Sequence, residues 1–295
     1  MEFVDLHSHT NESDGTAAPV ELVQLAMRAN LAALAITDHD TFAGFEKALP
    51  FAREHAFDLI RGIELNSRLY VPGAVQPRFV HVLGYFPSNE PAASFHAWLQ
   101  NERESRRERN SRLIEALAQR GIAITLEEVE ARGRSLTGRP HFARILVEKG
   151  YARNLDDAFK KYLGEEAPSY VERESHSLEQ VIRIVRSGGG IPVIAHPIRL
   201  GLTPEQERRV LTSAKDAGLL GLEVHHSEHP ATVRAHYEQL AKDLDLTPTG
   251  GSDFHGDAKP NVRLGEGVAG NVRVPRTLVD GLRALQKLAT EPRTK

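Results

Sequence analysis

Short apolar runs rich in Val, Ile and Leu recur along the chain, and they are followed by polar clusters and helical patterns. The runs span Phe3–Leu6, Leu31–Ile36, Asp58–Ile63, Val80–Phe86, Ile191–Ala195, Leu219–Val224 and Leu246–Thr249. The helical patterns cover about residues 19–30, 42–55, 178–187, 204–217, 230–243 and 276–290. Strands that alternate with helices predict an α/β fold with a parallel sheet, either open or closed.

Two of these helices carry start signals. Ser177 and Gln180 have the spacing of a capping box, in which each side chain bonds the other residue's backbone N–H. Thr203 and Gln206 repeat this spacing, and Pro204 occupies the first helical position, where its missing N–H is not needed. We therefore expect these two helices to begin near residues 178 and 204.

Residues 94–171 depart from this alternation. They contain a charged segment, NERESRRERNSR, and several short helical patterns, but no strand rich in Val and Ile. We expect a small helical insertion here. Because charges of both signs alternate over Glu102–Arg112, the simplest interpretation of that segment is a solvated helix face.

Side chains that can bind metal ions gather around the ends of the apolar runs. They are His7, His9 and Asp14 after the first run, Asp38, His39 and Asp40 after the second, Glu64 after the third, His81 in the fourth, His196 after the fifth, His225 and His226 after the sixth, and Asp253 and His255 after the seventh. In a parallel sheet or barrel the C-terminal strand ends open on one face, where the following loops build the active site. We therefore expect these side chains to meet at one point.

Composition restricts the chemistry of such a site. The 295 residues include 14 His, more than the 11 Phe or the 6 Tyr, and no Cys. Disulfides, thiolate zinc sites, iron–sulfur clusters and a cysteine nucleophile are thereby excluded. Any metal ion must be held by imidazole and carboxylate.

The charge balance and the N-terminal segment narrow the partners and the location. With 37 Lys and Arg against 40 Asp and Glu, the formal net charge is −3, without the broad basic surface that long duplex DNA requires. The N-terminal segment lacks the basic start and apolar stretch of a signal peptide, and no later run reaches the roughly 18 apolar residues of a membrane helix. We expect a cytoplasmic protein with no duplex DNA and no membrane partner.

Seven motifs taken together resemble the polymerase and histidinol phosphatase (PHP) superfamily of metal-dependent phosphoesterases. They are VDLHSHTNESDG, AITDHDT, GIELN, VHVLGY, VIAHP, GLEVHHSEH and GGSDFH, in this order over essentially the whole chain. The resemblance implies a distorted (β/α)7 barrel formed by residues 1–93 and 172–295, with the helical insertion at 94–171 as a substrate cap. It also implies three divalent metal ions bound by His7, His9, Asp14, His39, Glu64, His81, His196, Asp253 and His255.

The insertion is similar to that of a bacterial branch of this superfamily that acts on small nucleotides. The similar motifs are TGRPHFARILVEKGY and DDAFKKYLGEEAPSYV. The resemblance implies removal of the 3′-phosphate of nucleoside 3′,5′-bisphosphates and trimming of short RNA from its 5′ end, so the expected partners are a small phosphorylated nucleotide and short single-stranded RNA. Glu165, Glu166 and Ala167 stand where the branch often has a basic residue, which weakens the case for this loop as a site for the second phosphate.

Nine ligands can supply three ions with about three each and leave open positions for water and substrate. Mixed imidazole and carboxylate donors suit Mn²⁺, the metal we expect, as well as Fe²⁺ or Zn²⁺. Glu64 is the expected bridge between two ions, because a carboxylate has two oxygens. Ions roughly 3.5–4 Å apart would turn a shared water into the hydroxide that attacks phosphorus. Asp38 and Asp40 are expected to orient ligand imidazoles through hydrogen bonds.

Further residues are candidates for substrate contact and catalysis. Arg199 is expected at the mouth of the site, either as a phosphate contact or in a surface ion pair. Arg139 and His141 stand in a Gly-Arg-Pro-His turn that either positions them on the substrate or only precedes a helix. His226 or His229 could protonate the leaving oxygen, because His titrates near neutral pH, or His229 could simply flank the helix near residue 230.

Three other functions stay open at this point. A histidinol-phosphate phosphatase belongs to the same superfamily. A metal-dependent amidohydrolase uses comparable barrels with His-x-His clusters, but Glu64 stands in place of an obvious metal-bridging Lys. An inactive proofreading-type module usually has lost ligands, and none of the nine is missing.

Overall fold

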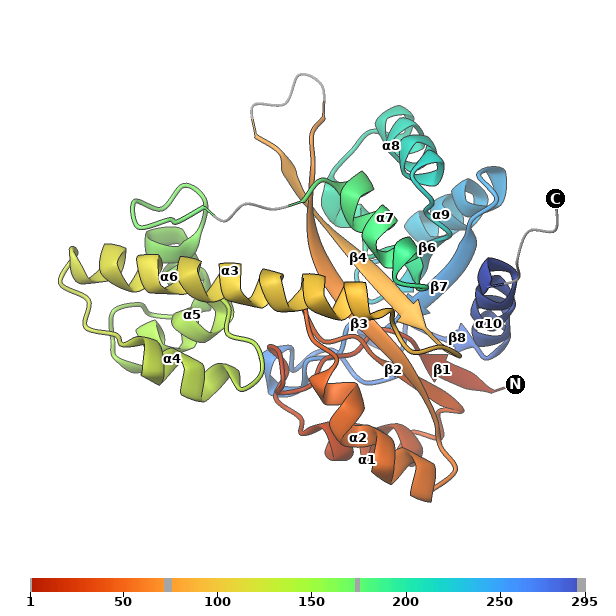
Figure 1. The fold of residues 1–295 in the computed structure, drawn as a ribbon, viewed down its shortest axis with the longest axis horizontal. Helices are drawn as coiled ribbons and strands as arrows, with labels where there is room; N and C mark the ends of the chain where they lie inside the picture. Colours follow the sequence, from red (N-terminus) through yellow and green to blue (C-terminus); the bar gives the residue numbers. More distant parts are fainter. Residues whose placement is uncertain (1, 72–75, 173–175, 291–295) are drawn as a thin grey trace.

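Eight strands form one sheet in the part of the chain that the computed structural model describes, residues 2–71, 76–172 and 176–290. They are β1 (Phe3–Asp5), β2 (Ala33–Ile36), β3 (Asp58–Leu69), β4 (Arg78–Phe86), β5 (Ile191–Ile194), β6 (Gly221–His226), β7 (Thr247–Gly251) and β8 (Val274–Pro275), in the spatial order β7-β6-β5-β4-β3-β2-β1-β8. The residue that follows β1 meets β7, because Leu6 N donates to Gly250 O at 3.1 Å. The result is the distorted, nearly closed barrel that was expected (Figure 1).

The strands do not all run parallel, so the prediction of a parallel sheet is wrong at β4 and β8. β4 pairs antiparallel with β3 and with β5, and β8 pairs antiparallel with β1. A parallel crossover needs a dozen or more residues, whereas only residues 70–77 join β3 to β4, and the chain turns back as a hairpin. β8 was not predicted, because two residues are too few to show a periodic pattern.

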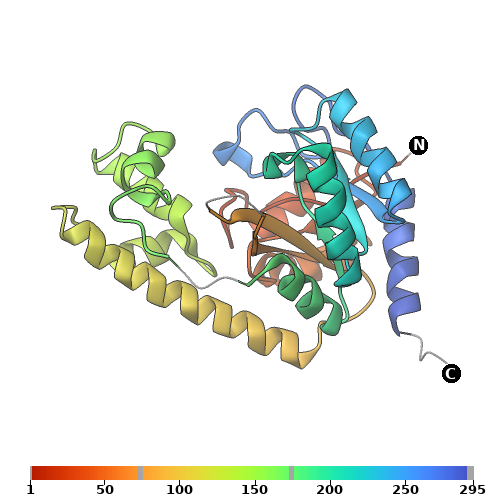
Figure 2. The same cartoon turned by 90° about the horizontal axis from the view of Figure 1, so that it is seen from above.

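Helices cover the barrel strands, which are buried on both faces (Figures 1 and 2). The surrounding helices are α1 (Pro19–Arg28), α2 (Ala43–Glu54), α7 (Leu178–Ser187), α8 (Pro204–Asp216), α9 (Ala231–Asp243) and α10 (Thr277–Thr290). In β2, Ala33 and Ala35 belong to one hydrophobic cluster, while Leu34 and Ile36 belong to another that includes residues of α1 and α2. Burial on both faces explains why these strands read as continuous apolar runs.

Both predicted capping boxes are confirmed. Ser177 Oγ accepts a hydrogen bond from Gln180 N at 3.3 Å, and Ser177 N donates to Gln180 Oε1 at 2.8 Å. Thr203 and Gln206 exchange the same two bonds at 3.3 and 3.0 Å. These bonds fix the starts of α7 and α8 on the outside of the barrel. None of the described helices is long and apolar enough to cross a membrane.

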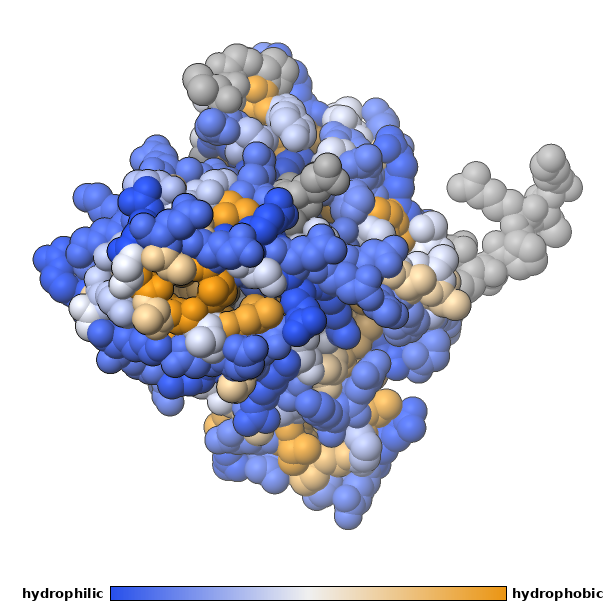
Figure 3. All heavy atoms as spheres, turned by 60° about the vertical axis from the view of Figure 1, so that its left-hand side comes forward, coloured by the Kyte–Doolittle hydropathy of each residue, from blue (hydrophilic) through white to orange (hydrophobic). Residues whose placement is uncertain are grey.

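Four helices and a π-helical turn stand beside the barrel, and we call them the cap. They are α3 (Ala93–Ala118), α4 (Leu126–Gly133), α5 (Arg139–Glu148), α6 (Leu155–Ala158) and the turn Phe159–Leu163. These elements share a hydrophobic cluster that includes Leu117, Val129 and Phe142. Figures 1 and 2 show α3 as the long helix that extends from the barrel to the other helices of the cap. On the side that the cap presents in Figure 3, a hydrophobic patch lies within a mainly hydrophilic surface.

One side of α3 carries arginines that face the barrel. Arg109 is buried, Arg106 forms an ion pair with Asp40, and Arg103 Nε donates to Asp40 O at 3.3 Å. Arg107, between them, is exposed, with 68% of its side-chain surface accessible. The interpretation of this segment as a solvated helix face is therefore wrong for one side, because α3 packs across the barrel end in a tertiary contact that its charge pattern does not reveal.

Candidate metal centre

Nine histidine and acidic side chains meet at one end of the barrel. They are His7 and His9 after β1, Asp14 in the loop beyond, His39 after β2, Glu64 in β3, His81 in β4, His196 after β5, and Asp253 and His255 after β7. His81 lies near the beginning of its strand, because the antiparallel β4 starts at the end of the barrel where its parallel neighbours finish. The structure thus brings together all nine residues that the resemblance implied as ligands.

Glu64 lies at the centre of this cluster and is almost wholly buried. Its two oxygens lie 2.7 to 3.4 Å from one nitrogen of each of five imidazoles, those of His7, His9, His39, His81 and His196. Oε2 faces the first three rings and Oε1 the last two. This two-sided arrangement is the one that a carboxylate bridging two cations needs.

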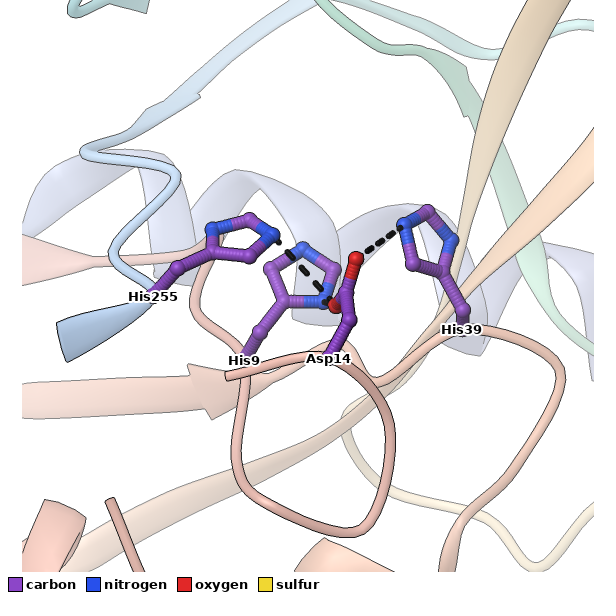
Figure 4. Close-up of side chains that lie close together, drawn as sticks. All are labelled: His9, Asp14, His39 and His255. Atoms are coloured by element: carbon purple, nitrogen blue, oxygen red, sulfur yellow. Dashed lines mark ion pairs between the residues drawn. The ribbon is translucent and has the colours of Figure 1, made fainter. Parts of the chain in front are cut away.

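Asp14 and Asp253 stand between the remaining imidazoles. The Asp14 carboxylate lies between His255 and His39, with Oδ1 3.4 Å from His255 Nε2 and Oδ2 3.7 Å from His39 Nε2 (Figure 4). Asp253 Oδ1 lies 3.5 Å from His9 Nε2 and 3.4 Å from His255 Nδ1. Three carboxylates are therefore interleaved with the imidazole rings. Several rings, such as those of His9 and His255, lie close to two of these carboxylates.

These donors fit divalent cations. Among the described residues, sets whose ligand atoms all lie within 4.8 Å of one another are His9–Asp14–His39–His255, His7–Glu64–His196, His7–His9–Asp253, His39–Glu64–His81 and His7–Glu223–His226. The buried nitrogens His7 Nε2 and His9 Nε2 have no hydrogen-bond partner within the described structure. Because buried polar atoms nearly always have a partner, these nitrogens suit metal coordination.

The surroundings set the ionisation of the cluster. Burial alone would raise the pKa of the Glu64 carboxyl, but the imidazoles, with that of His39 foremost, hold this pKa well below its usual range. Burial lowers the pKa of His39 to about 4 and that of His196 to about 3, which keeps both rings in the neutral form that binds metal. Burial also opposes protonation of His9, yet Asp253 and Glu64 raise its pKa to about 9. A divalent cation would balance the same carboxylates.

The backbone at the cluster is strained and tightly packed. His196 has φ of 27° and Asp253 has φ of 57°, conformations that surrounding contacts must enforce. Glu223 supplies such contacts, since its Oε2 accepts from His196 N at 2.5 Å and its Oε1 lies 2.8 Å from His7 Nδ1. Gly251 allows β7 to approach, because a Cβ there would lie 2.3 Å from His7 N. Sequence reasoning missed Glu223, although a charged residue inside an apolar run was a signal for it.

Asp38 fixes the loop that follows β1. It accepts hydrogen bonds from Thr10 N and Thr10 Oγ1, both at 2.7 Å, and from Ser13 Oγ at 2.6 Å. The prediction that Asp38 orients a ligand imidazole by a hydrogen bond is therefore wrong, because its oxygens are directed at the loop that carries Asp14. Asp40, expected in the same role, forms its ion pair with α3.

Arg199 and Lys259 both contact Asp253. Arg199 Nη2 lies 3.0 Å from Asp253 Oδ2, and its guanidinium also forms two bonds with Glu228 at 2.5 and 2.9 Å. Arg199 thus lies at the mouth of the site and forms ion pairs with Glu228 and Asp253, while its contact with a phosphate stays a prediction. Lys259 Nζ lies 2.6 Å from the same Asp253 oxygen. Its position in an irregular loop gave no signal in the sequence.

His226 and His229 lie behind Asp253. His226 Nε2 is 3.4 Å from Asp253 Oδ2, while its Nδ1 accepts from Glu228 N at 3.1 Å. His229 is buried, and its Nδ1 bonds to Val224 O at 2.8 Å. Neither ring lines the cavities described below. Their role as proton donors stays a prediction.

A cleft separates the cluster from the cap. One cavity, of about 240 Å³, is lined by Asp14, His39 and His81 together with Arg106, Arg139 and His141. A second, of about 270 Å³, is lined by Glu64, Asp253 and His255 together with Arg144, Arg199 and Lys259. A third, of about 60 Å³, is lined by Arg68, Arg106, Arg109 and Arg139 and shares two of these arginines with the first. The predicted substrate residues Arg139 and His141 therefore face the cleft, and the cluster lies between two groups of cationic side chains.

Comparisons with known proteins agree with this geometry. A family model described as PHP domain matches residues 5–165. A 5′-3′ exoribonuclease of Haemophilus influenzae is 32% identical over 252 residues, which cover 85% of this chain and 89% of that relative. A 3′,5′-nucleoside bisphosphate phosphatase of Chromobacterium violaceum is 31% identical over 258 residues, covering 86% and 88%. The solved structure of a protein described as a metal-dependent phosphoesterase from Bifidobacterium adolescentis has a TM-score of 0.78 and 34% identity over 96% of both chains.

Proposed function

The chain belongs to the PHP family of metal-dependent phosphoesterases, and from this premise we propose that it removes the 3′-phosphate of nucleoside 3′,5′-bisphosphates. It is a phosphoric ester hydrolase with clusters of His, Asp and Glu able to bind metal. The relative from Chromobacterium violaceum is named for hydrolysis of the same substrate class, which supports this choice of substrate.

The observation that carries the proposal is a second cationic region in the same cleft. Arg106 and Arg139 line the cavity that begins at the cluster residues Asp14, His39 and His81. The same two arginines line the small cavity beyond, with Arg68 and Arg109. A guanidinium binds phosphate through two parallel hydrogen bonds. One phosphate at the cluster and a second among the arginines match a nucleoside that carries two phosphates.

The nine clustered residues would hold the metal ions, which when bound supply positive charge to the phosphate and lower the pKa of water so that it attacks phosphorus. Glu64, at the centre of the cluster, would hold them through its carboxylate. Arg199 and Lys259 would hold Asp253 in place through its Oδ2 and leave Oδ1 facing the cluster. His226 would support the same Asp253 oxygen from behind.

The cap would close the cleft over the nucleoside. Its Arg144 donates to Asp14 O at 2.8 Å, so it ties α5 to the loop that carries a candidate ligand. Arg139, Pro140 and His141, at the start of α5, line the cavity next to the cluster. Closure of this kind would orient the substrate and reduce the access of water to the reacting phosphate.

Trimming of short RNA from its 5′ end is a second activity that one observation favours. The cavity with Arg144, Arg199 and Lys259 lies beside Glu64 and Asp253, away from the four arginines. A nucleotide chain that crosses the cluster would find cations on both sides. The relative from Haemophilus influenzae is named a 5′-3′ exoribonuclease.

A phosphate-release screen with Mn²⁺ tests the proposal. The substrates are adenosine 3′,5′-bisphosphate, adenosine 3′-monophosphate, histidinol phosphate and a short 5′-phosphorylated RNA. We expect the highest kcat/KM with the bisphosphate and measurable trimming of the RNA. Clear preference for histidinol phosphate, the alternative substrate of this family, would contradict the proposed function.

A further inference from the structure

The small cavity at the far end of the cleft concentrates positive charge. Arg68, on β3, is 4% exposed, and its guanidinium carbon lies 3.7 Å from the centre of the Phe79 ring. Arg139, on α5, lies 5.6 Å from the same ring and 5.7 Å from that of Tyr170. Two guanidiniums thus share one aromatic side chain. Because like charges repel in a poorly solvated site, such a pocket is stabilised when an anion enters it.

The positive charges of Arg106 and Arg139 in this pocket are not neutralised to the same extent by carboxylates. Arg106 is paired with Asp40, outside the pocket. In the described part of the chain, Arg139 has no carboxylate within ion-pair distance, and its Nη1 donates only to Leu163 O at 3.3 Å. Burial lowers the pKa of Arg139, as expected for a guanidinium with incomplete solvation. The positive charge of Arg139, which lies in this pocket with Arg68, is therefore not neutralised by a carboxylate of the described residues.

Glu165, on the cap, places a negative charge against Arg68 and Tyr170, two of the residues that line this pocket. Its Oε1 lies 2.7 Å from Arg68 Nη1 and 3.3 Å from Tyr170 Oη, and Tyr170 Oη also accepts from Arg68 Nη2 at 3.3 Å. Glu165 stands in the turn after Phe159–Leu163, and 35% of its side-chain surface is accessible. Arg68 is held by Phe79, Tyr170 and Glu165, whereas Glu165 lies in a turn and is partly exposed to solvent.

We propose that the Glu165 carboxylate neutralises Arg68 of the arginine pocket as an internal anion, which the second phosphate of the substrate must displace from this arginine. The inference rests on the proposed function, because it takes the pocket as the site of that phosphate. A phosphate monoester carries more negative charge and more acceptor oxygens than a carboxylate, so it can replace Glu165 on Arg68 and also engage Arg139. The mononucleotide product keeps this phosphate after the 3′-phosphate is removed, and Glu165 competes with it, which favours product release.

Binding of adenosine 5′-monophosphate to the Mn²⁺-loaded, full-length protein tests the inference. In Glu165→Gln the competing charge is removed at nearly constant shape, and we expect the Kd measured by calorimetry to fall about fivefold, the effect of losing one partly exposed ion pair. The matched control is Glu166→Gln, which removes the same charge from the neighbouring exposed residue. We expect its Kd to equal that of the wild type. Equal or weaker binding by Glu165→Gln would overturn the inference, because Glu165 would then only position Arg68.

Kinetics provide a second readout that separates this inference from the proposed function. For Glu165→Gln, we expect the ratio of kcat/KM for adenosine 3′,5′-bisphosphate to that for adenosine 3′-monophosphate to rise about fivefold over the wild-type ratio. An unchanged ratio, in an enzyme that hydrolyses the bisphosphate well, would refute the inference and leave the proposed function intact. Tighter monophosphate binding by a protein that releases no phosphate from the bisphosphate would support the anion pocket and refute the proposed substrate.

Discussion

At the scale of single residues, Glu64 is an acidic side chain buried among imidazoles at the centre of the cluster. It is 1% exposed, and five imidazoles lie against its two oxygens. Burial favours the neutral acid, yet the surrounding rings hold the pKa of this carboxyl well below its usual range. A residue kept anionic without exposure to water is suited to bind cations.

Glu64→Gln is expected to reduce kcat for phosphate release on the order of 10³-fold, the scale seen when a preorganised charge contact to a reacting group is lost. Gln has nearly the same shape, so the far-ultraviolet circular dichroism should be unchanged. Phosphate release and metal content per chain, measured on the same sample, check this prediction. Full activity in the variant would contradict the role given to Glu64.

His141 makes stability depend on pH in a predictable direction. It is 2% exposed, and burial, reinforced by the nearby Arg144, lowers its pKa below the ordinary value of 6.5. Below pH 6.5 the unfolded chain therefore binds more protons at this residue than the folded protein does, and stability falls as the pH drops. One such group contributes a slope of at most about 1.4 kcal/mol per pH unit.

His141→Gln should make the fall in unfolding free energy between pH 7 and pH 5 less steep. Gln cannot be protonated in this range, and it suits the third position of α5, where His141 Nδ1 now accepts from Gly138 N at 3.2 Å. Urea unfolding of both proteins at each pH measures the slopes. Identical slopes would show that His141 is not kept neutral by its surroundings.

At the scale of secondary-structure elements, α3 contributes an arginine to the cleft, although its charge pattern predicted only a solvated helix. It extends from the barrel to the other helices of the cap. Its Arg106 lines both the cavity beside the cluster and the arginine pocket. Arg107, the next residue, is exposed and paired with Glu130 at 2.6 Å. Two adjacent arginines on one helix therefore have different surroundings, which makes them a matched pair for mutagenesis.

Arg106→Ala is expected to raise KM for adenosine 3′,5′-bisphosphate about tenfold, the effect of one lost charge-assisted hydrogen bond. Arg107→Ala should leave KM within twofold of the wild type, because its guanidinium is exposed outside the cleft. Initial rates over a range of substrate concentrations give both values. Equal changes of KM in the two variants would contradict the role given to Arg106 in binding the substrate.

The sequence was sufficient to predict those residues of the site that stand at or near the end of a strand. His7 and His196 come directly after apolar runs, Asp253 follows another run after a short Gly-Gly-Ser segment, and the barrel topology brings the three together. The sequence was not sufficient for Lys259 or Arg68, because a loop residue and a residue near the end of β3 acquire their roles only from the packing of distant segments. The antiparallel β4 was missed for a related reason, since pattern alone does not give strand direction.

At the scale of the whole molecule, the cluster joins segments from residue 7 to residue 255. Its carboxylates and rings are buried or half-buried against one another, so a cation that binds them would connect β1, β3, β5 and β7 at one point. A ligand that binds only the folded state stabilises it by mass action, by about 2.7 kcal/mol when its concentration is 100 times the Kd.

Removal of metal by a chelator should therefore lower Tm as well as abolish phosphate release. Addition of Mn²⁺ should restore both, with a Tm that rises further as the concentration increases. Scanning calorimetry and phosphate release on chelated and reconstituted samples check this prediction. A Tm that is the same with and without metal would mean that the cluster does not bind a cation in the folded protein.

The proposed function requires that one cleft receives two phosphates of the same substrate, one at the cluster of His, Asp and Glu side chains and one among the arginines. Its most direct test is the ratio of kcat/KM for adenosine 3′,5′-bisphosphate to kcat/KM for adenosine 3′-monophosphate in the wild-type protein. Two charge-assisted hydrogen bonds to the second phosphate predict a ratio of about 10². A ratio near one would show that the second phosphate is not bound, and would contradict the account.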